Sequence, residues 1–196
     1  MAPLTSGLDL LESVVGYALA TASCATQQQL QRPTPCSAWD LAMLLDHVSD
    51  SMDVVNEALA SGQVRSALPP EPGHDGHQAD PIGCLRRQAA RLLRTCATAG
   101  SGDRLIAFGD RQLSARCVAL TGAMEIAVHG WDISAACGAD QPVPPGLAAV
   151  LLPVAPLIVP AGIRPGLFAD PVRLSGPVCP GDQLVAFFGR KHTRSR

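Results

Sequence analysis

Apolar residues recur every three or four positions in four long stretches of the chain. This spacing is typical of α-helices that bury one face, because residues three and four apart lie on the same side of a helix. In the first stretch, Leu8, Leu11, Val15 and Leu19 follow this rule. The pattern predicts four long helices, at residues 8–30, 37–60, 80–99 and 114–138.

Each stretch is bounded by residues that favour helix ends. The first stops before the proline pair in residues 32–35. Ser37, with an acidic residue at Asp40, is the predicted N-cap of the second. The third predicted helix opens with a capping carboxylate followed by a proline, and the fourth opens with a capping serine and ends at a glycine. These residues are Asp80-Pro81, Ser114 and Gly138.

Outside these stretches the apolar pattern is shorter. Residues 105–108 predict a short strand, followed by a turn at Gly109-Asp110. Residues 146–159 predict a helix broken by prolines, and residues 182–188 a short closing helix. Residues 63–79 are rich in proline and glycine and predict a loop. We therefore expect a mainly all-α fold, an up-down four-helix bundle with a short strand-like segment and a Pro-rich C-terminal extension.

We expect one domain over residues 1–190 and a disordered tail over residues 191–196. The 196 residues are enough to bury a core without disulfides. The net charge of -2 gives no basic footprint for nucleic acid or an anionic membrane. The longest apolar run, residues 147–159, contains two prolines and is shorter than the roughly 20 residues of a membrane helix. We expect a small-molecule substrate as partner, in a monomer or homodimer, with neither nucleic acid nor membrane.

The cysteines and the N-terminus indicate a cytoplasmic protein. Asp9 and Glu12 stand where a signal peptide needs an uncharged core. The seven cysteines are odd in number and form no C-x-x-C pair, which fits a reducing compartment. Most stand among small apolar residues and are expected in the core. Cys36 lies in a turn-like setting, but no histidine or basic residue adjoins it to activate a nucleophile.

Glu125 and His129 stand four residues apart within an apolar helical stretch. Residues at this spacing lie one above the other on a helix, so both side chains can reach one ion. The third candidate ligand is His47, which interrupts an apolar run in the second predicted helix, where a buried polar group needs a partner. Two imidazoles and a carboxylate suit zinc, nickel or ferrous iron and leave a coordination position open.

Other interpretations of the histidines remain open. A histidine and a glutamate at helical spacing also occur as ordinary hydrogen-bonded or surface residues. His74 and His77 form an H-x-x-H pair that can bind metal, but a flexible loop must first be ordered at an entropic cost. The arginines of the third helix are expected on its solvated face, although one of them could reach an anionic substrate. They are Arg86, Arg87, Arg91 and Arg94.

Four motifs together resemble a known family. They are Pro33-Thr34-Pro35-Cys36 with Trp39-Asp40, Leu44-Leu45-Asp46-His47-Val48, Glu125-Ile126-Ala127-Val128-His129-Gly130-Trp131-Asp132 and Phe188-Gly189-Arg190. The chain resembles the DinB-like metal-binding helical family related to the N-terminal domain of mycothiol-dependent maleylpyruvate isomerase. The resemblance implies a four-helix bundle that holds a divalent metal through His47, Glu125 and His129. Where the family commonly has Pro-Gly, this chain has Ser37-Ala38, and it leaves no room for the isomerase's separate C-terminal domain.

Such a metal, most simply zinc, allows two reaction classes. In one, a low-molecular-weight thiol such as mycothiol is activated for transfer or isomerisation. In the other, the metal promotes hydrolysis, elimination or rearrangement without a thiol. A non-catalytic sensor or interaction module is a third possibility, favoured if Cys or Asp supplies a fourth ligand. A structural dimerisation domain without metal would require the three ligands to lie apart.

The sequence identifies no catalytic side chain, because the reacting group would be a water or thiol on the metal. Asp132 is the first choice for a carboxylate that orients a histidine by bonding the ring nitrogen away from the metal, ahead of Asp46 and Asp50. Trp39 and Trp131 are expected mainly in the core, with the wall of a pocket as their alternative role.

Overall fold

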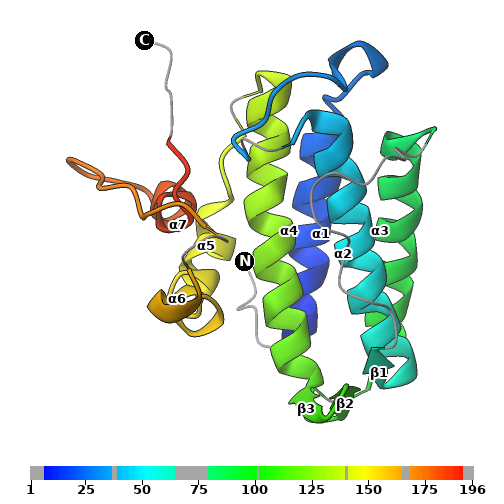
Figure 1. Cartoon of the computed structure of the whole chain (residues 1–196). Helices are drawn as coiled ribbons and strands as arrows, with labels where there is room; N and C mark the ends of the chain where they lie inside the picture. Colours follow the sequence, from blue (N-terminus) through cyan, green and yellow to red (C-terminus); the bar gives the residue numbers. More distant parts are fainter. Residues whose placement is uncertain are drawn as a thin grey trace.

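We analysed the protein as a computed structural model of the full chain, and the description covers residues 7–36, 39–64, 79–100, 102–139, 141–164 and 168–191. Four long helices form a bundle (Figure 1). Their bounds are Gly7–Ala22 for α1, Leu41–Ser61 for α2, Pro81–Thr98 for α3 and Ala115–Cys137 for α4. The predicted mainly helical fold with a four-helix bundle is confirmed.

The side-chain contacts give the direction of each helix. Asp53 of α2 pairs with Arg91 of α3, and Asn56 bonds Thr95 one turn later on both helices, so α2 and α3 run parallel. The helices therefore follow one another up, down, down and up (Figure 1), so the simple up-down order predicted for the bundle is wrong. Because the two helices are parallel, α3 begins at the end of the bundle opposite to the one at which α2 stops (Figure 1).

A small sheet closes one end of the bundle (Figure 1). The predicted strand is confirmed as β2, Leu105–Phe108, and a turn leads into the antiparallel strand β3, Arg111–Ser114. Gln63–Val64, predicted as loop, instead forms strand β1 and pairs in parallel with β2. That pairing joins segments more than 40 residues apart, which local patterns do not reveal.

The C-terminal extension packs beside α4 and α1. It contains three short helices, α5 at Pro145–Leu151, α6 at Ala155–Ile158 and α7 at Pro180–Phe187. The proline-broken helix and the closing helix are thus confirmed. Because α4 touches the bundle on one side and the extension on the other, 15 of its 23 residues are buried.

Two predicted helix boundaries are wrong. The first helix ends at Ala22 and not at Leu30, because a separate 3-10 turn at Gln27–Gln29 follows. A capping box between Thr26 and Gln29 marks the start of that turn. The second begins after Asp40, whose carboxylate accepts the Met43 N–H at 2.9 Å. Ser37, the predicted cap, lies outside the described residues, as do residues 192–196 of the tail. The other predicted caps, at Asp80, Ser114 and Gly138, are confirmed.

The side chains of the cysteines and arginines only partly follow expectation. All seven cysteines are free, but Cys84 and Cys96 alone are buried, so the prediction that most belong to the core is wrong. Cys117 is exposed and Cys179 caps α7 with its sulfur. The four arginines of α3 all lie on the exposed face, as expected. No described helix combines the length and apolar character that a membrane span requires.

Gly130 lets α1 and α4 approach closely beside His129, one of the candidate ligands. A Cβ built at this position would lie 2.9 Å from Cε1 of the buried Tyr17 ring. Tyr17 cannot easily move away, since its hydroxyl donates to the Gln141 carbonyl at 2.9 Å. A larger residue at 130 would therefore push α1 and α4 apart next to His129.

We predict opposite effects for two alanine substitutions in these helices. Gly130→Ala should lower the free energy of unfolding, because overpacking costs about 1–3 kcal/mol and outweighs the roughly 1 kcal/mol of helix propensity that alanine supplies. Gly16→Ala is the matched control, since a Cβ at that exposed position in α1 meets no atom within 4 Å. It should raise the stability by up to about 1 kcal/mol. Urea unfolding measures both, and equal shifts would contradict the close approach.

Candidate metal centre

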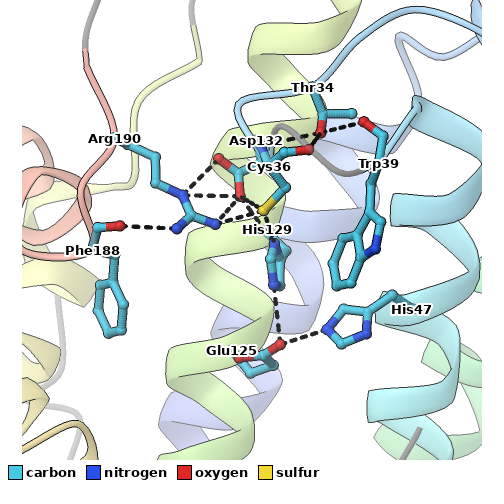
Figure 2. A network of polar contacts seen from close by, with 9 residues as sticks. All are labelled: Thr34, Cys36, Trp39, His47, Glu125, His129, Asp132, Phe188 and Arg190. Carbon is cyan, nitrogen blue, oxygen red and sulfur yellow. Dashed lines mark hydrogen bonds and ion pairs between the residues drawn. The ribbon is translucent and has the colours of Figure 1, made fainter. Parts of the chain in front are cut away.

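His47, Glu125 and His129 meet where α2 and α4 face each other (Figure 2). His47 Nε2 lies 2.7 Å from Glu125 Oε1, and His129 Nε2 lies 3.1 Å from the same oxygen. The ligand atoms of the three residues all lie within 4.8 Å of one another. The structure thus brings together the three residues that the sequence proposed as ligands.

Burial differs across these three side chains. The exposed fraction is 8% for His129, 20% for His47 and 35% for Glu125. His129 is therefore fixed inside the bundle, whereas Glu125 is the most exposed of the three side chains.

In the metal-free protein, the surroundings favour the charged forms of Glu125 and His129, and His129 must give up its Nε2 proton to bind a metal. Burial alone would raise the pKa of Glu125, but His129 and His47, which both donate hydrogen bonds to its carboxylate, lower that pKa far below its usual range. Burial would likewise lower the pKa of His129, yet Glu125 and Asp132 raise it well above its usual value. The protein therefore stabilises an anionic oxygen at the position where a cation would be bound.

Asp132 binds the other ring nitrogen of His129. Its Oδ2 lies 2.9 Å from His129 Nδ1, and the carboxylate is fully buried. Burial would raise the pKa of Asp132, but the hydrogen bonds from His129 and Arg190 lower it. A carboxylate at Nδ1 fixes the ring orientation and leaves Nε2 for the metal, as in many metal sites. The expected orienting role of Asp132 agrees with this geometry.

Arg190, three residues after the end of α7, completes the network from the C-terminal extension (Figure 2). Its Nη2 lies 2.8 Å from Asp132 Oδ2 and its Nε lies 3.2 Å from Oδ1, which gives a two-pronged ion pair. Burial tends to lower the pKa of Arg190, but Asp132 raises it, so the guanidinium stays charged.

Cys36 lies on the Nδ1 side of the His129 ring, together with Asp132 and Arg190. Its Sγ lies 2.8 Å from Arg190 Nη2, 3.6 Å from Asp132 Oδ2 and 4.0 Å from His129 Nδ1. The local sequence predicts no basic neighbour for Cys36. In the fold Arg190, 154 positions later in the chain, is such a neighbour. Because Cys36 and Asp132 both face Nδ1, neither is placed to be a fourth ligand at Nε2.

The turn before α2 carries Cys36 and Trp39 to the site. The Thr34 side-chain oxygen accepts the Cys36 N–H at 3.2 Å and lies 2.9 Å from the carbonyl oxygens of Cys36 and Trp39. The Trp39 ring lies beside His47 with 4.3 Å between ring centroids. Trp39 therefore borders the candidate centre as well as the core, whereas Trp131 is a buried core residue.

The family comparison agrees with this arrangement. Residues 13–134, more than half of the chain, match the family model described as the mycothiol maleylpyruvate isomerase N-terminal domain. The chain belongs to this family. The matched residues contain all three candidate ligands and Asp132, whereas Arg190 lies beyond them.

Two curated relatives extend the similarity of this family member beyond the matched residues. They are the uncharacterized proteins MT0763 of Mycobacterium tuberculosis strain CDC 1551 and Rv0738 of strain H37Rv. Each is 29% identical over 164 residues, which cover 83% of this chain and 85% of the relative. No solved structure matches the chain.

The structure does not assign the remaining sequence candidates to the centre. Burial raises the pKa of Asp50 and the nearby His47 partly opposes this, which places Asp50 close to that imidazole on α2. We assign no role to Asp46. His74 and His77 lie outside the described residues. For Arg190, the sequence signal was its place in the closing Phe-Gly-Arg motif, which did not say what it contacts.

We predict that two aspartate–arginine pairs of equal length differ strongly in their value to the fold. Arg190–Asp132 and Arg91–Asp53 both have a shortest N···O distance of 2.8 Å, but the side chains are 10% and 0% exposed in the first pair and 55% and 45% in the second. Asp132→Ala strands a buried cation and should cost about 3–5 kcal/mol. Asp53→Ala should cost about 1 kcal/mol or less, because solvent screens that pair.

Chemical unfolding of the metal-free protein measures both losses. The exposed pair controls for the general effect of removing an aspartate that bonds an arginine. Similar losses for the two variants would show that burial of the Arg190–Asp132 pair does not govern its contribution.

Proposed function

We propose that this protein is a divalent-metal-dependent enzyme that acts on a small metabolite by thiol-dependent transfer or isomerisation. The observation that carries the proposal is the group of His47, Glu125 and His129, whose ligand atoms converge within 4.8 Å. Two imidazole nitrogens and a carboxylate oxygen are the donor set of catalytic zinc sites and also suit nickel and ferrous iron.

The arrangement favours catalysis over a closed, purely structural ion. Among the described residues, the other potential ligands near His129 are Cys36 and Asp132, and both lie at its Nδ1. The Nε2 side is thus left with three protein ligands, of which the Glu125 side chain is 35% exposed. This supports an open position for a substrate or thiol and argues against the sensor with a fourth protein ligand.

The residues have separate tasks in this proposal. His47 and His129 would hold the ion through Nε2 and Glu125 through Oε1. Asp132 keeps the His129 ring in the orientation that presents Nε2. Trp39 covers the His47 ring on one side. When bound, the divalent ion supplies Lewis acidity, which makes a thiol or water beside it more acidic and polarises a substrate oxygen.

The choice of a thiol cosubstrate rests on family membership, because the name of the family refers to mycothiol. A low-molecular-weight thiol and an electrophilic metabolite are accordingly the proposed small-molecule partners, in the cytoplasm. Metal-promoted hydrolysis, elimination or rearrangement would use the same residues without the thiol.

Metal content is the first test. The parent protein should bind about one divalent ion per chain, and His47→Ala, Glu125→Ala and His129→Ala should each lose most of it, because two remaining ligands hold an ion weakly. His74→Ala and His77→Ala are the controls and should retain the metal. Elemental analysis after loading with zinc, nickel or ferrous iron gives the count. A parent without metal, or loss of metal in the loop variants instead, would overturn the assignment.

The reaction class is tested separately with the metal-loaded parent. Electrophilic small metabolites are screened with and without mycothiol, and His129→Ala serves as the inactive control. We expect turnover that requires both the metal and the thiol. Turnover without thiol would replace this mechanism by the hydrolytic or rearrangement class, and metal binding without any turnover would favour the binding module.

A further inference from the structure

A second group of ligand-type side chains lies behind His129. Cys36 Sγ, Asp132 Oδ2 and His129 Nδ1 lie within 4.8 Å of one another, so by composition and spacing they could also hold a cation. This group shares His129 with the candidate metal centre but uses the opposite ring nitrogen. A neutral imidazole offers one lone pair, so the two groups compete for the same residue.

A cation is already present at this second group. Arg190 Nη2 lies 2.8 Å from both Cys36 Sγ and Asp132 Oδ2 (Figure 2). Its Nε adds contacts of 3.2 Å and 3.3 Å to the two Asp132 oxygens. The guanidinium is thus bonded to two of the three side chains that a metal ion would use.

The chain holds this guanidinium firmly. Arg190 Nη1 donates to the Phe188 carbonyl at 2.9 Å, and the Arg190 backbone N–H donates to Val185 at 3.0 Å. Between them Gly189 has φ of 80°, and a Cβ there would lie 2.7 Å from that of Ala169. Glycine therefore permits the tight turn that aims the side chain back toward α4.

We propose that Arg190 is a positioning residue that selects which side of His129 binds metal. Its guanidinium occupies the Cys36, Asp132 and His129 group as a built-in cation. It thereby keeps the Cys36 sulfur and the Asp132 carboxylate out of the coordination sphere. The ion is directed to Nε2, where His47 and Glu125 complete a site with an open position. This inference rests on the proposed metal site and adds the C-terminal extension to it.

The physical reason is charge balance. Removing Arg190 leaves the buried Asp132 carboxylate without its main cation, and an unpaired buried charge is costly. A divalent ion would relieve that cost, and Cys36 adds a soft ligand that binds transition metals strongly. In a variant without the guanidinium, part of the metal should therefore move to the sulfur side of the ring.

Cobalt(II) absorption tests this directly, because a cobalt–thiolate bond gives a charge-transfer band in the near ultraviolet that nitrogen and oxygen ligands do not. The full-length parent loaded with cobalt should show no such band. Arg190→Ala should acquire it, and Arg190→Ala combined with Cys36→Ser should lose it again. Arg190→Lys keeps the positive charge and should resemble the parent.

Arg164→Ala is the matched control within the extension. Arg164 is also buried, and it donates to the carbonyls of Ala169 at 2.6 Å and Phe187 at 2.5 Å, but no contact links it to the ligand groups. Loosening the extension through Arg164 should leave the cobalt spectrum unchanged. If Arg164→Ala also produced the thiolate band, docking of the extension and not the guanidinium would control the metal, and the proposal would be wrong.

The remaining outcomes separate this inference from the proposed function. A thiolate band in the parent, or cobalt bound by Arg190→Ala without one, would overturn the role of Arg190 while leaving a metal site in place. No cobalt in the parent would refute the proposed function and with it this inference. If Arg190→Ala does not fold, Arg190→Gln replaces it, because it fills most of the same space without the charge and should give the same band.

Discussion

The candidate site depends on one buried imidazole with a carboxylate at each ring nitrogen. Glu125 precedes His129 by four residues and Asp132 follows it by three, so the geometry of α4 alone places all three on one stripe. The ring is 8% exposed and cannot turn away from these partners without unpacking the bundle. The helix thus determines which nitrogen faces His47 on α2 and which faces the extension.

This arrangement imposes a charge requirement on the rest of the chain. Two carboxylates within contact of one imidazole need more positive charge than that imidazole supplies, and an unpaired buried carboxylate would cost several kcal/mol. Arg190 provides the missing charge from a segment that otherwise packs through its apolar residues. The site therefore depends on the packing of the extension against α4 for its positive charge as well as for the burial of apolar residues.

Local signals were sufficient for most of the fold. Capping residues marked α3 and α4 because Asp80 and Ser114 bond the helix N-terminus a few residues away. The first helix was predicted too long, since its apolar spacing continues past Ala22 into a separate turn. Strand β1 was missed because two residues carry no periodicity and are ordered by pairing with a distant strand.

The difference between local signals and contacts of distant segments also explains which site residues the sequence predicts. Glu125, His129 and Asp132 follow from helical spacing, and His47 from the principle that a polar residue in an apolar helix face needs a partner. The contacts of Arg190 with Asp132 and with Cys36 span 58 and 154 positions. No local pattern encodes such separations, because they depend on how the extension folds back onto α4.

The imidazole also divides the site into two chemically different sides. At Nδ1, an arginine, a buried aspartate and a cysteine form a closed polar network with little exposed surface. At Nε2, Glu125 is 35% exposed and Trp39 lies beside His47. The closed side fixes the orientation of the ring, and in the proposed function a small molecule would meet the ligands on the more exposed side. Under the proposed function, the choice of substrate should therefore depend on the residues around Glu125 and Trp39.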